Sequence, residues 1–388
     1  MPDAPNSALT DAARLRDRLK GWALSTAFPL WWTVGADHKG GGFFETIEQS
    51  GEAKDSPRRG RVLPRQIYAF AAARDLGWTG PWREAVEYGL RYYLDVYRKP
   101  NGLFRALVGP GGVSLDDTSA LYDQAFAMFA LANACAVTGR SDLRDVAVSV
   151  RETLYATLKN PLGGFNESTP TDPPLHSNPH MHLFEACLAW NAIDADPKWR
   201  ELADEIAELA LSKFISAETG ALREFFDDQW NPAPGVAGRI WEPGHQYEWA
   251  WLLLRWGKLA GRPDAIAAAL RMIDLAETKG VDPERGVGMN AMLDDMTAHD
   301  AGARLWPQTE RIKAGVLAAE VTGDDKWWGV AAEGAEGLLQ YLRTPVPGLW
   351  RDKLKPDGAF VEEAAPASSF YHIVCAIAEM DRVVTAAT

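Results

Sequence analysis

A period of about sixty residues runs through the whole chain. Each period contains a glycine followed by an apolar or aromatic residue, and successive glycines lie 56 to 66 residues apart. Repetition at a fixed period of this kind is typical of folds assembled from repeated supersecondary units. The six occurrences are Gly42-Phe43, Gly102-Leu103-Phe104, Gly164-Phe165, Gly220-Ala221-Leu222, Gly286-Val287 and Gly348-Leu349-Trp350.

A second marker divides the period into two helices. Between the recurring glycines, a turn residue is followed closely by Pro or Asp, as from Gly77 to Pro81 and from Gly261 to Asp264. Glycine is favoured just past the end of a helix, and Pro or Asp in the first turn of the next one. Apolar residues recur at helical spacing on both sides, whereas alternation every two residues is scarce. The sequence therefore predicts an all-α fold.

Twelve helices in six hairpins are expected, and no Ser/Gly-rich linker separates them. We therefore expect a single domain over residues 1–388. Six hairpins of this size either stack into an open superhelix or close into a toroid of six inner and six outer helices around one pocket. The expected helices lie near residues 8–27, 61–76, 81–96, 116–138, 141–159, 178–195, 197–214, 241–260, 263–279, 304–321, 325–341 and 368–385.

Composition excludes several classes of partner. The chain has 40 Lys+Arg and 53 Asp+Glu, a net charge of −13 that disfavours nucleic acid and anionic membranes. One dense basic stretch, Arg58 to Arg65, suits a phosphate or carboxylate, although a solvated loop is the commoner explanation. No apolar run is long enough to cross a membrane, and the first twenty residues lack the apolar core of a signal peptide. Three widely spaced cysteines without a CxxC pair fit a reducing compartment, so we expect a cytoplasmic protein with no membrane or nucleic-acid partner.

Polar residues that are unusual inside a helix lie near the start of the first helix of successive hairpins. The intervals from one to the next are 57 to 66 residues. In a closed toroid, equivalent positions of all the inner helices face one mouth, so these side chains would converge. They are Arg65, Tyr122 with Gln124, His182, His245, Trp306 with Glu310, and His372.

Two of these segments share a finer pattern, His182-x-x-Glu185 and His245-x-x-Glu248. Residues three apart share one face of a helix, where a carboxylate can accept a hydrogen bond from the imidazole, fix its tautomer and raise its basicity. Taken singly, a histidine in an apolar helix is more often a core residue than a catalyst, and the Glu residues and Arg65 have an ordinary explanation as ion-pair partners. Three histidines at one phase of the period favour a functional site.

The other histidines and a metal site have weaker support. His38, His176 and His299 fall in loops outside that phase, and His180 has a lesser claim than His182. His180-x-His182 raises the question of a divalent metal, but helical residues two apart point in different directions, and di-metal bundles use the reverse order, Glu-x-x-His. No glycine-rich phosphate loop is evident in the sequence. We expect neither a metal nor a nucleotide or nicotinamide cofactor.

Five short segments follow one another between about residue 61 and residue 373. They are Arg65-Gln66-Ile67-Tyr68, Asn178-x-x-Met181-His182-x-x-Glu185, Pro243-Gly244-His245-x-x-Glu248-Trp249, Arg304-x-Trp306-Pro307-x-x-Glu310 and Tyr371-His372. This ordered set resembles the N-acylglucosamine 2-epimerase superfamily, which also contains mannose isomerases, sulfoquinovose isomerase and cellobiose 2-epimerase. The resemblance implies an (α/α)6 barrel and chemistry at C1 and C2 of an aldose, without an obligatory metal or redox cofactor.

The resemblance also implies roles for individual residues. By position, His245 and His372 are the general acid/base pair, and His182 binds the sugar or assists ring opening. Arg65 contacts the oxygen that becomes part of an enediolate. The other residues expected to bind substrate or support the site are Tyr122, Asn178, Glu185, Glu248, Trp306 and Glu310.

The third segment, Pro-Gly-His-x-x-Glu-Trp, is closer to the isomerase branch than to the cellobiose epimerases. We therefore expect an aldose-ketose isomerase, a monomer or homodimer, that acts on mannose or a related unphosphorylated hexose by histidine-mediated proton transfer. The alternative is a 2-epimerase of the N-acylglucosamine, mannose/glucose or cellobiose type. Two other classes fit less well: a glycoside hydrolase needs two carboxylates where His and Arg predominate, and a helical scaffold opens its concave face to a protein.

Overall fold

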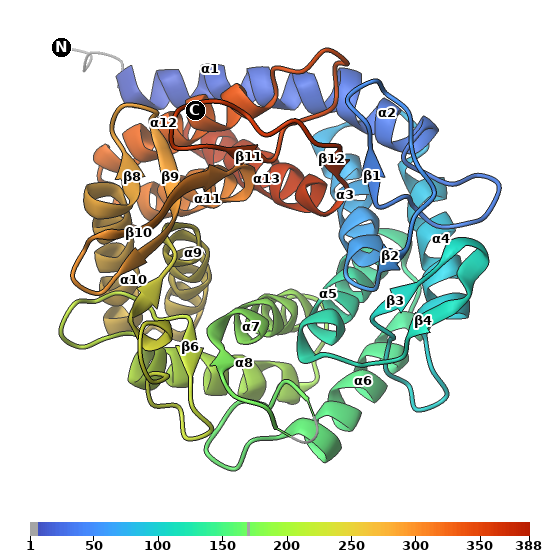
Figure 1. The fold of residues 1–388 in the computed structure, drawn as a ribbon, viewed down its shortest axis with the longest axis horizontal. Helices are drawn as coiled ribbons and strands as arrows, with labels where there is room; N and C mark the ends of the chain where they lie inside the picture. The colour runs from blue at the N-terminus through green and yellow to red at the C-terminus, as the bar shows by residue number, and fades with distance from the viewer. Residues whose placement is uncertain (1–6, 169–170) are drawn as a thin grey trace.

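The computed structural model describes residues 7–168 and 171–388. In this part of the chain, six inner helices surround a central axis and six outer helices pack around them (Figure 1). The inner helices are α3 (Val62–Leu76), α5 (Leu121–Thr138), α7 (Ser177–Asn191), α9 (Pro243–Ala260), α11 (Leu305–Thr322) and α13 (Ser368–Ala387). The outer helices are α1 (Ser7–Trp22), α4 (Trp82–Tyr92), α6 (Asp142–Leu158), α8 (Pro197–Leu209), α10 (Pro263–Leu275) and α12 (Lys326–Tyr341). They correspond one to one with the twelve expected helices.

Several outer helices are extended at their C-terminal ends. The chain adds a single π-helical turn after α1, α4, α8 and α10, and the short helix α2 (Phe28–Thr33) follows the first of these turns. The π-helical turns are Ala23–Ala27, Tyr93–Tyr97, Ala210–Phe214 and Ala276–Gly280. These extensions explain why the expected outer helices were longer than the α-helical segments alone.

The ring of inner helices is closed. Helix α13 packs against both α3 and α11, and each of the other inner helices packs against the inner helix before it and the one after it. At the junction of the two chain ends, α1 packs against α12 and α13 and completes the outer layer (Figure 1). The fold is therefore an (α/α)6 barrel and not an open superhelix.

The recurring glycines lie at turns where the backbone has a positive φ. At Gly42 a Cβ atom would lie 2.8 Å from the ring of Tyr92, and its φ of 72° is one that glycine adopts at little cost. The residue after such a glycine then bridges back to the segment that follows the outer helix, as in Ala36 with Phe43 and Lys159 with Phe165. Positive φ values from 66° to 94° are found at all six, Gly42, Gly102, Gly164, Gly220, Gly286 and Gly348.

Several of these turns are tied to the inner helix that follows them. Gln124 exchanges two hydrogen bonds of 2.8 Å with the backbone of Phe104, and Gln246 accepts one of 2.8 Å from the backbone N–H of Leu222. His180 has the equivalent role in the third repeat, where its Nε2 accepts a hydrogen bond of 3.0 Å from the backbone N–H of Phe165. The structure therefore assigns Gln124 and His180 to the scaffold of the barrel.

Short strands lie in the loops that lead into the inner helices, and the sequence did not predict them. The longest two, β9 (Val287–Leu293) and β10 (Ala298–Arg304), form an antiparallel hairpin whose register shifts twice, which breaks the alternation that reveals a strand in a sequence. The expected helix start near residue 116 was also wrong, since residues 114–116 form a strand and α5 begins at Leu121. The other strands are β1 (Thr46–Ile47), β2 (Arg58–Arg59), β3 (Leu107–Val108), β4 (Ser114–Asp116), β5 (Leu175–His176), β6 (Phe225–Phe226), β7 (Ile240–Trp241), β8 (Val281–Asp282), β11 (Lys353–Leu354) and β12 (Ala365–Pro366).

Candidate active site

A cavity of about 210 Å³ lies where the N-terminal ends of the inner helices meet. Eight of the ten predicted site residues line it, and the other two, Glu185 and Glu310, contact His182 and His372 from behind. The convergence expected for a closed ring is therefore present. The lining residues are Arg65, Tyr122, Asn178, His182, Glu242, His245, Glu248, Arg304, Trp306 and His372. A larger groove of about 540 Å³ on the outer surface, between α1 and α12, has no histidine in its lining.

The helix ends themselves favour negative charge in this cavity. Arg65, Tyr122, Asn178, His245, Trp306 and His372 all lie within the first five residues of their helices. The N-terminus of a helix carries a partial positive charge and unpaired backbone N–H groups. Six such ends around one cavity would stabilise an anionic intermediate.

His245 is held as a charged imidazolium. Its Nδ1 lies 2.8 Å from Glu224 Oε2 and 3.5 Å from Glu242 Oε2. Burial alone would lower the pKa of His245, but the charges of Glu224 and Glu242 outweigh burial and raise it to about 10. At neutral pH this histidine therefore presents an N–H group to the cavity and can donate a proton.

His372 has the opposite character. Its Nδ1 lies 2.8 Å from Glu310 Oε1, so the carboxylate holds the ring in the tautomer with the proton on Nδ1. Burial, together with the positive charges of Arg65 and Lys313, lowers the pKa of His372 well below its ordinary value. A neutral imidazole with a free Nε2 is a proton acceptor, so the cavity contains one acid and one base.

Trp306 lies beside both histidines. The centroid of its ring is 4.9 Å from that of His245 and 5.7 Å from that of His372. This packing requires the glycine of the Pro-Gly-His segment, because a Cβ atom on Gly244 would come within 2.5 Å of the Trp306 ring. Gly244 therefore leaves room for the Trp306 ring beside His245.

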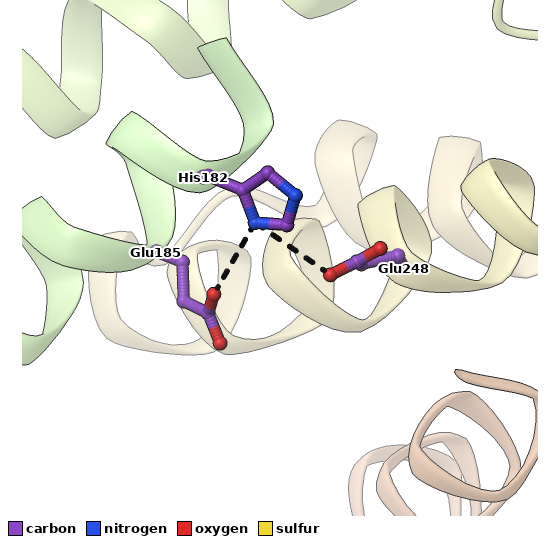
Figure 2. A group of neighbouring side chains, drawn as sticks. All are labelled: His182, Glu185 and Glu248. Atoms are coloured by element: carbon purple, nitrogen blue, oxygen red, sulfur yellow. Dashed lines mark ion pairs between the residues drawn. The ribbon is translucent and has the colours of Figure 1, made fainter. Parts of the chain in front are cut away.

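His182 lies between two carboxylates, Glu185 and Glu248 (Figure 2). Its Nδ1 is 3.7 Å from Glu185 Oε2 and 3.9 Å from Glu248 Oε1, which is too long for hydrogen bonds. Burial lowers the pKa of His182 to about 4, so the ring is neutral. Glu185 Oε2 accepts a hydrogen bond of 2.5 Å from the Tyr371 hydroxyl instead.

The expected hydrogen bonds within the two His-x-x-Glu segments are therefore not formed. His245 bonds to Glu224, which belongs to the loop before β6, and Glu248 projects one turn deeper into the ring, toward His182. Spacing along a helix fixes the face on which a side chain lies. The hydrogen-bond partner of that side chain depends on which group from another element lies closest to it.

Arg65 and Asn178 each have a polar atom without a hydrogen-bond partner in the described residues, Nε of Arg65 and Oδ1 of Asn178. Arg65 donates to the Tyr122 hydroxyl at 2.7 Å and lies 4.2 Å from the centroid of the Phe126 ring, and it pairs with no carboxylate in the described residues. Asn178 Oδ1 is buried and has no hydrogen-bond partner there either. An unpaired cation beside a neutral base suits the stabilisation of an oxyanion.

The other arginines of the basic stretch are neutralised. Arg58 lies 2.6 Å from Asp37, Arg59 pairs with Glu45, and Arg61 lies 3.4 Å from Asp123. The structure therefore favours the ordinary explanation of this stretch over an anion site.

Residues 42–376 match the sequence profile of N-acylglucosamine 2-epimerases. The chain belongs to the N-acylglucosamine 2-epimerase family. Over 376 residues it is 49% identical to a protein of Rhizobium meliloti (strain 1021) named mannose-6-phosphate isomerase, covering 94% of this chain and 96% of the relative. A D-mannose isomerase of Marinomonas mediterranea is 26% identical over 89% of this chain and 92% of its own.

Solved structures show how widely the fold of this epimerase family is shared. A D-mannose isomerase superposes with a TM-score of 0.86 at 23% identity, covering 96% of this chain and 98% of its own. Cellobiose 2-epimerase from Bacillus thermoamylovorans B4167 gives 0.86 at 18% identity, covering 95% of this chain and all of its own. A GH76 α-mannanase of Bacteroides thetaiotaomicron still gives 0.66 at 12% identity, covering 100% of this chain and 97% of its own. The barrel alone therefore does not choose between isomerase and hydrolase chemistry.

Several donor groups of this family member lie close enough together to raise the question of a metal ion. Within the described residues, three groups of His and Glu bring donor atoms together: His182 with Glu185 and Glu248, Glu224 with Glu242 and His245, and Glu248 with Glu310 and His372. Two of the groups have a donor paired with a residue outside the group: Tyr371 pairs with Glu185, and Lys313 lies 2.5 Å from Glu310. In the third group, Glu224 and His245 pair with each other. The donors fit internal pairing better than a cation, and a metal-free site stays our prediction.

Four residues of the site were not among the predicted ones: Glu224, Glu242, Arg304 and Lys313. Glu224 lies in a loop and its sequence context carries no signal of its role. Arg304 stands in one of the family segments, and Lys313 follows Glu310 by one helical turn within an apolar helix. An unexpected buried Glu-x-x-Lys pair of this kind is a signal that sequence reasoning could have used.

Proposed function

We propose that this chain is an aldose-ketose isomerase that converts mannose, or a closely related unphosphorylated hexose, into its 2-ketose. The observation that carries the proposal is the pair of histidines on one cavity, His372 neutral and His245 charged. The relative named D-mannose isomerase supports the same reading, and the relative named mannose-6-phosphate isomerase supports the aldose-ketose class of reaction. A cavity of about 210 Å³ is below the usual ~300–1,000 Å³ of drug-sized ligand pockets, so it suits a single sugar.

The reaction requires proton transfer next to a carbonyl group. After ring opening, His372 takes the proton from C2 while O1 gains the negative charge, which Arg65, the helix ends and the His245 imidazolium stabilise. The O2 hydroxyl then passes its proton to O1, and His372 returns its proton to C1. The product is the 2-ketose, and no atom is gained or lost.

A 2-epimerase remains the second candidate because His245 carries a proton of its own. If His245 delivers that proton to the opposite face of C2, while His372 keeps the one it removed, the product is the epimer. The same cavity thus supports both outcomes, and the substrate's orientation between the two histidines decides between them.

The charges in the cavity favour a sugar without a phosphate. Of the cations that line it, His245 is paired with Glu224 at 2.8 Å and Arg304 lies 3.3 Å from Asp352, so in the described residues only Arg65 lacks a carboxylate partner. A phosphate dianion usually binds where several free cations or N–H donors meet. Because one relative is named mannose-6-phosphate isomerase, the preference for a sugar without a phosphate must be tested by experiment.

We expect mannose to be converted to fructose, and mannose 6-phosphate to be a poorer substrate. The assay is NMR of each sugar with the protein in D2O, with EDTA and without nucleotide or nicotinamide, which also tests the prediction of a cofactor-free site. Glucose as the first product from mannose would replace the isomerase by the 2-epimerase. Faster turnover of mannose 6-phosphate would overturn the unphosphorylated substrate, and loss of activity in EDTA with recovery on adding one metal would overturn the metal-free site.

The two histidines also predict the pH dependence of kcat/KM. The base is active when His372 is neutral, which holds above its depressed pKa, so activity should persist well below pH 6.5. The acid is active while His245 is protonated, so activity should fall as the pH rises through about 10. A rate profile measured from pH 4 to 11 checks this, and an acid limb near pH 6.5 would show that His372 is an ordinary histidine.

The proposal extends to the setting of the enzyme. We infer that residues 1–388 act as one domain, because α1 and α13 together close the ring. We also propose a cytoplasmic monomer or homodimer that acts on a small sugar, as the charge and cysteine spacing indicate. Among the described residues, none of the helices combines the length and the apolar composition needed to cross a bilayer.

A further inference from the structure

The two histidine-carboxylate pairs are alike in geometry but opposite in charge. In each pair an imidazole Nδ1 lies 2.8 Å from a carboxylate oxygen, His245 with Glu224 and His372 with Glu310. All four side chains are buried. A carboxylate at this distance favours the imidazolium form, so distance alone predicts two charged histidines. Another group must distinguish the pairs.

The pairs differ at the second carboxylate oxygen. Lys313 Nζ lies 2.5 Å from Glu310 Oε2, and Lys313 is 0% exposed. The second oxygen of Glu224 accepts only the backbone N–H of Glu242, at 3.2 Å, and within the described residues no lysine or arginine pairs with it. The positive charge of Lys313 therefore offsets the negative charge of Glu310, which weakens the stabilisation of a His372 imidazolium. No such cation offsets Glu224 in the described residues, so its charge stabilises the His245 imidazolium more strongly.

The environment of Lys313 keeps it protonated. Burial opposes its charge, but the negative charges that surround it, the Cys375 sulfur when ionised and the carboxylates of Glu310, Glu248 and Glu185, raise the pKa of Lys313 above its ordinary value. Its Nζ also lies 3.8 Å from the centroid of the Trp251 ring, within range of a cation–π interaction. Lys313 is therefore a fixed buried cation that lies outside the cavity lining.

We propose that Lys313 is a positioning residue that balances the charge of Glu310 and thereby keeps His372 neutral, with its proton on Nδ1 and its Nε2 free to accept the substrate proton. The proposal deepens the isomerase function proposed above and rests on it. Lys313 acts from outside the cavity lining, through its ion pair with Glu310 and through its own positive charge.

Other charged and titratable groups also surround His372. They come from α3, α7, α9 and α13, and a substitution of Lys313 leaves all of them in place, so a change in His372 reports on Lys313. These groups are Arg65, His182, Glu185, His245, Glu248 and Tyr371.

The test is a Lys313→Met variant, which keeps the length of the side chain and removes its charge. With histidine ring nitrogens labelled by 15N, NMR follows the titration of His372, whose signals are identified by their absence in a His372→Asn variant. We expect its pKa to rise by about 1–3 units, and the acid limb of kcat/KM on mannose to move to higher pH by the same amount. The NMR titration needs no turnover, so it remains decisive even where the proposed isomerase activity fails.

Arg311→Met is the matched control. Arg311 lies two residues before Lys313 in α11 and is equally buried, but it pairs with Glu277 and Glu333, away from His372. This variant should lose stability without moving the His372 titration. An unchanged titration in Lys313→Met, or an equal shift in Arg311→Met, would overturn the proposal.

A double variant, Glu310→Gln with Lys313→Met, removes both charges of the ion pair and so leaves no unbalanced buried charge. It tests the control of His372 by this pair even if the single variant does not fold. The amide oxygen of the introduced glutamine can accept the Nδ1 proton, so His372 should again be neutral well below pH 6.5. A His372 that titrates at or above pH 6.5 in the double variant would show that a group other than Lys313 controls it.

Discussion

The His372→Asn variant should lose about 10²- to 10⁴-fold in kcat, the usual contribution of a general acid or base. Exchange of the C2 proton with D2O should be lost as well, because His372 is the proposed base for that proton. The fold should survive, since Glu310 keeps its ion pair with Lys313 at 2.5 Å and no buried charge is left unbalanced. Turnover and exchange by NMR, with thermal unfolding, measure all three.

His180→Asn is the matched control for this prediction. His180 is as deeply buried as His372, but it bonds to the backbone of Phe165 outside the cavity. Its replacement should lower the melting temperature and leave kcat nearly unchanged below that temperature. Near-normal turnover in His372→Asn, or loss of its folded state, would show that His372 is structural and that the assigned pair is wrong.

The His245→Asn variant should also lose about 10²-fold or more in kcat, but with a different signature. His372 can still remove the C2 proton, so some exchange with D2O should persist without net product. Stability should suffer more than in His372→Asn, because Glu224 and Glu242 lose their charged partner. Removing one member of a buried pair typically costs about 3–5 kcal/mol.

Chemical denaturation of the two variants at neutral pH separates these effects. Equal stability losses would indicate that His245 is not charged in the folded protein. Complete loss of exchange in His245→Asn, with exchange retained in His372→Asn, would reverse the assignment of acid and base.

The sequence by itself determined the twelve paired helices and most of the residues of the site, and its family resemblance implied the closed barrel. Glycines such as Gly42 and Gly77 fix turns by local backbone geometry, and helix spacing places His182, His245 and His372 at one phase of the period. These are local properties, because φ values and helical faces depend on residues within a few positions of each other. Once the ring closes, equivalent positions meet without further information. Eight of the ten predicted residues accordingly line one cavity.

The tertiary structure alone decided the hydrogen-bond partners and the charge of each histidine. His245 finds its carboxylate 21 positions away in a loop, and His372 finds its own 62 positions away on another helix, already neutralised by Lys313. The irregular hairpin of β9 and β10 was equally invisible, because its shifted register leaves no alternation to read. Proton affinity depends on charges within a few ångströms and on exclusion from water. Those distances are set by the packing of separate elements, and no spacing along the chain encodes them.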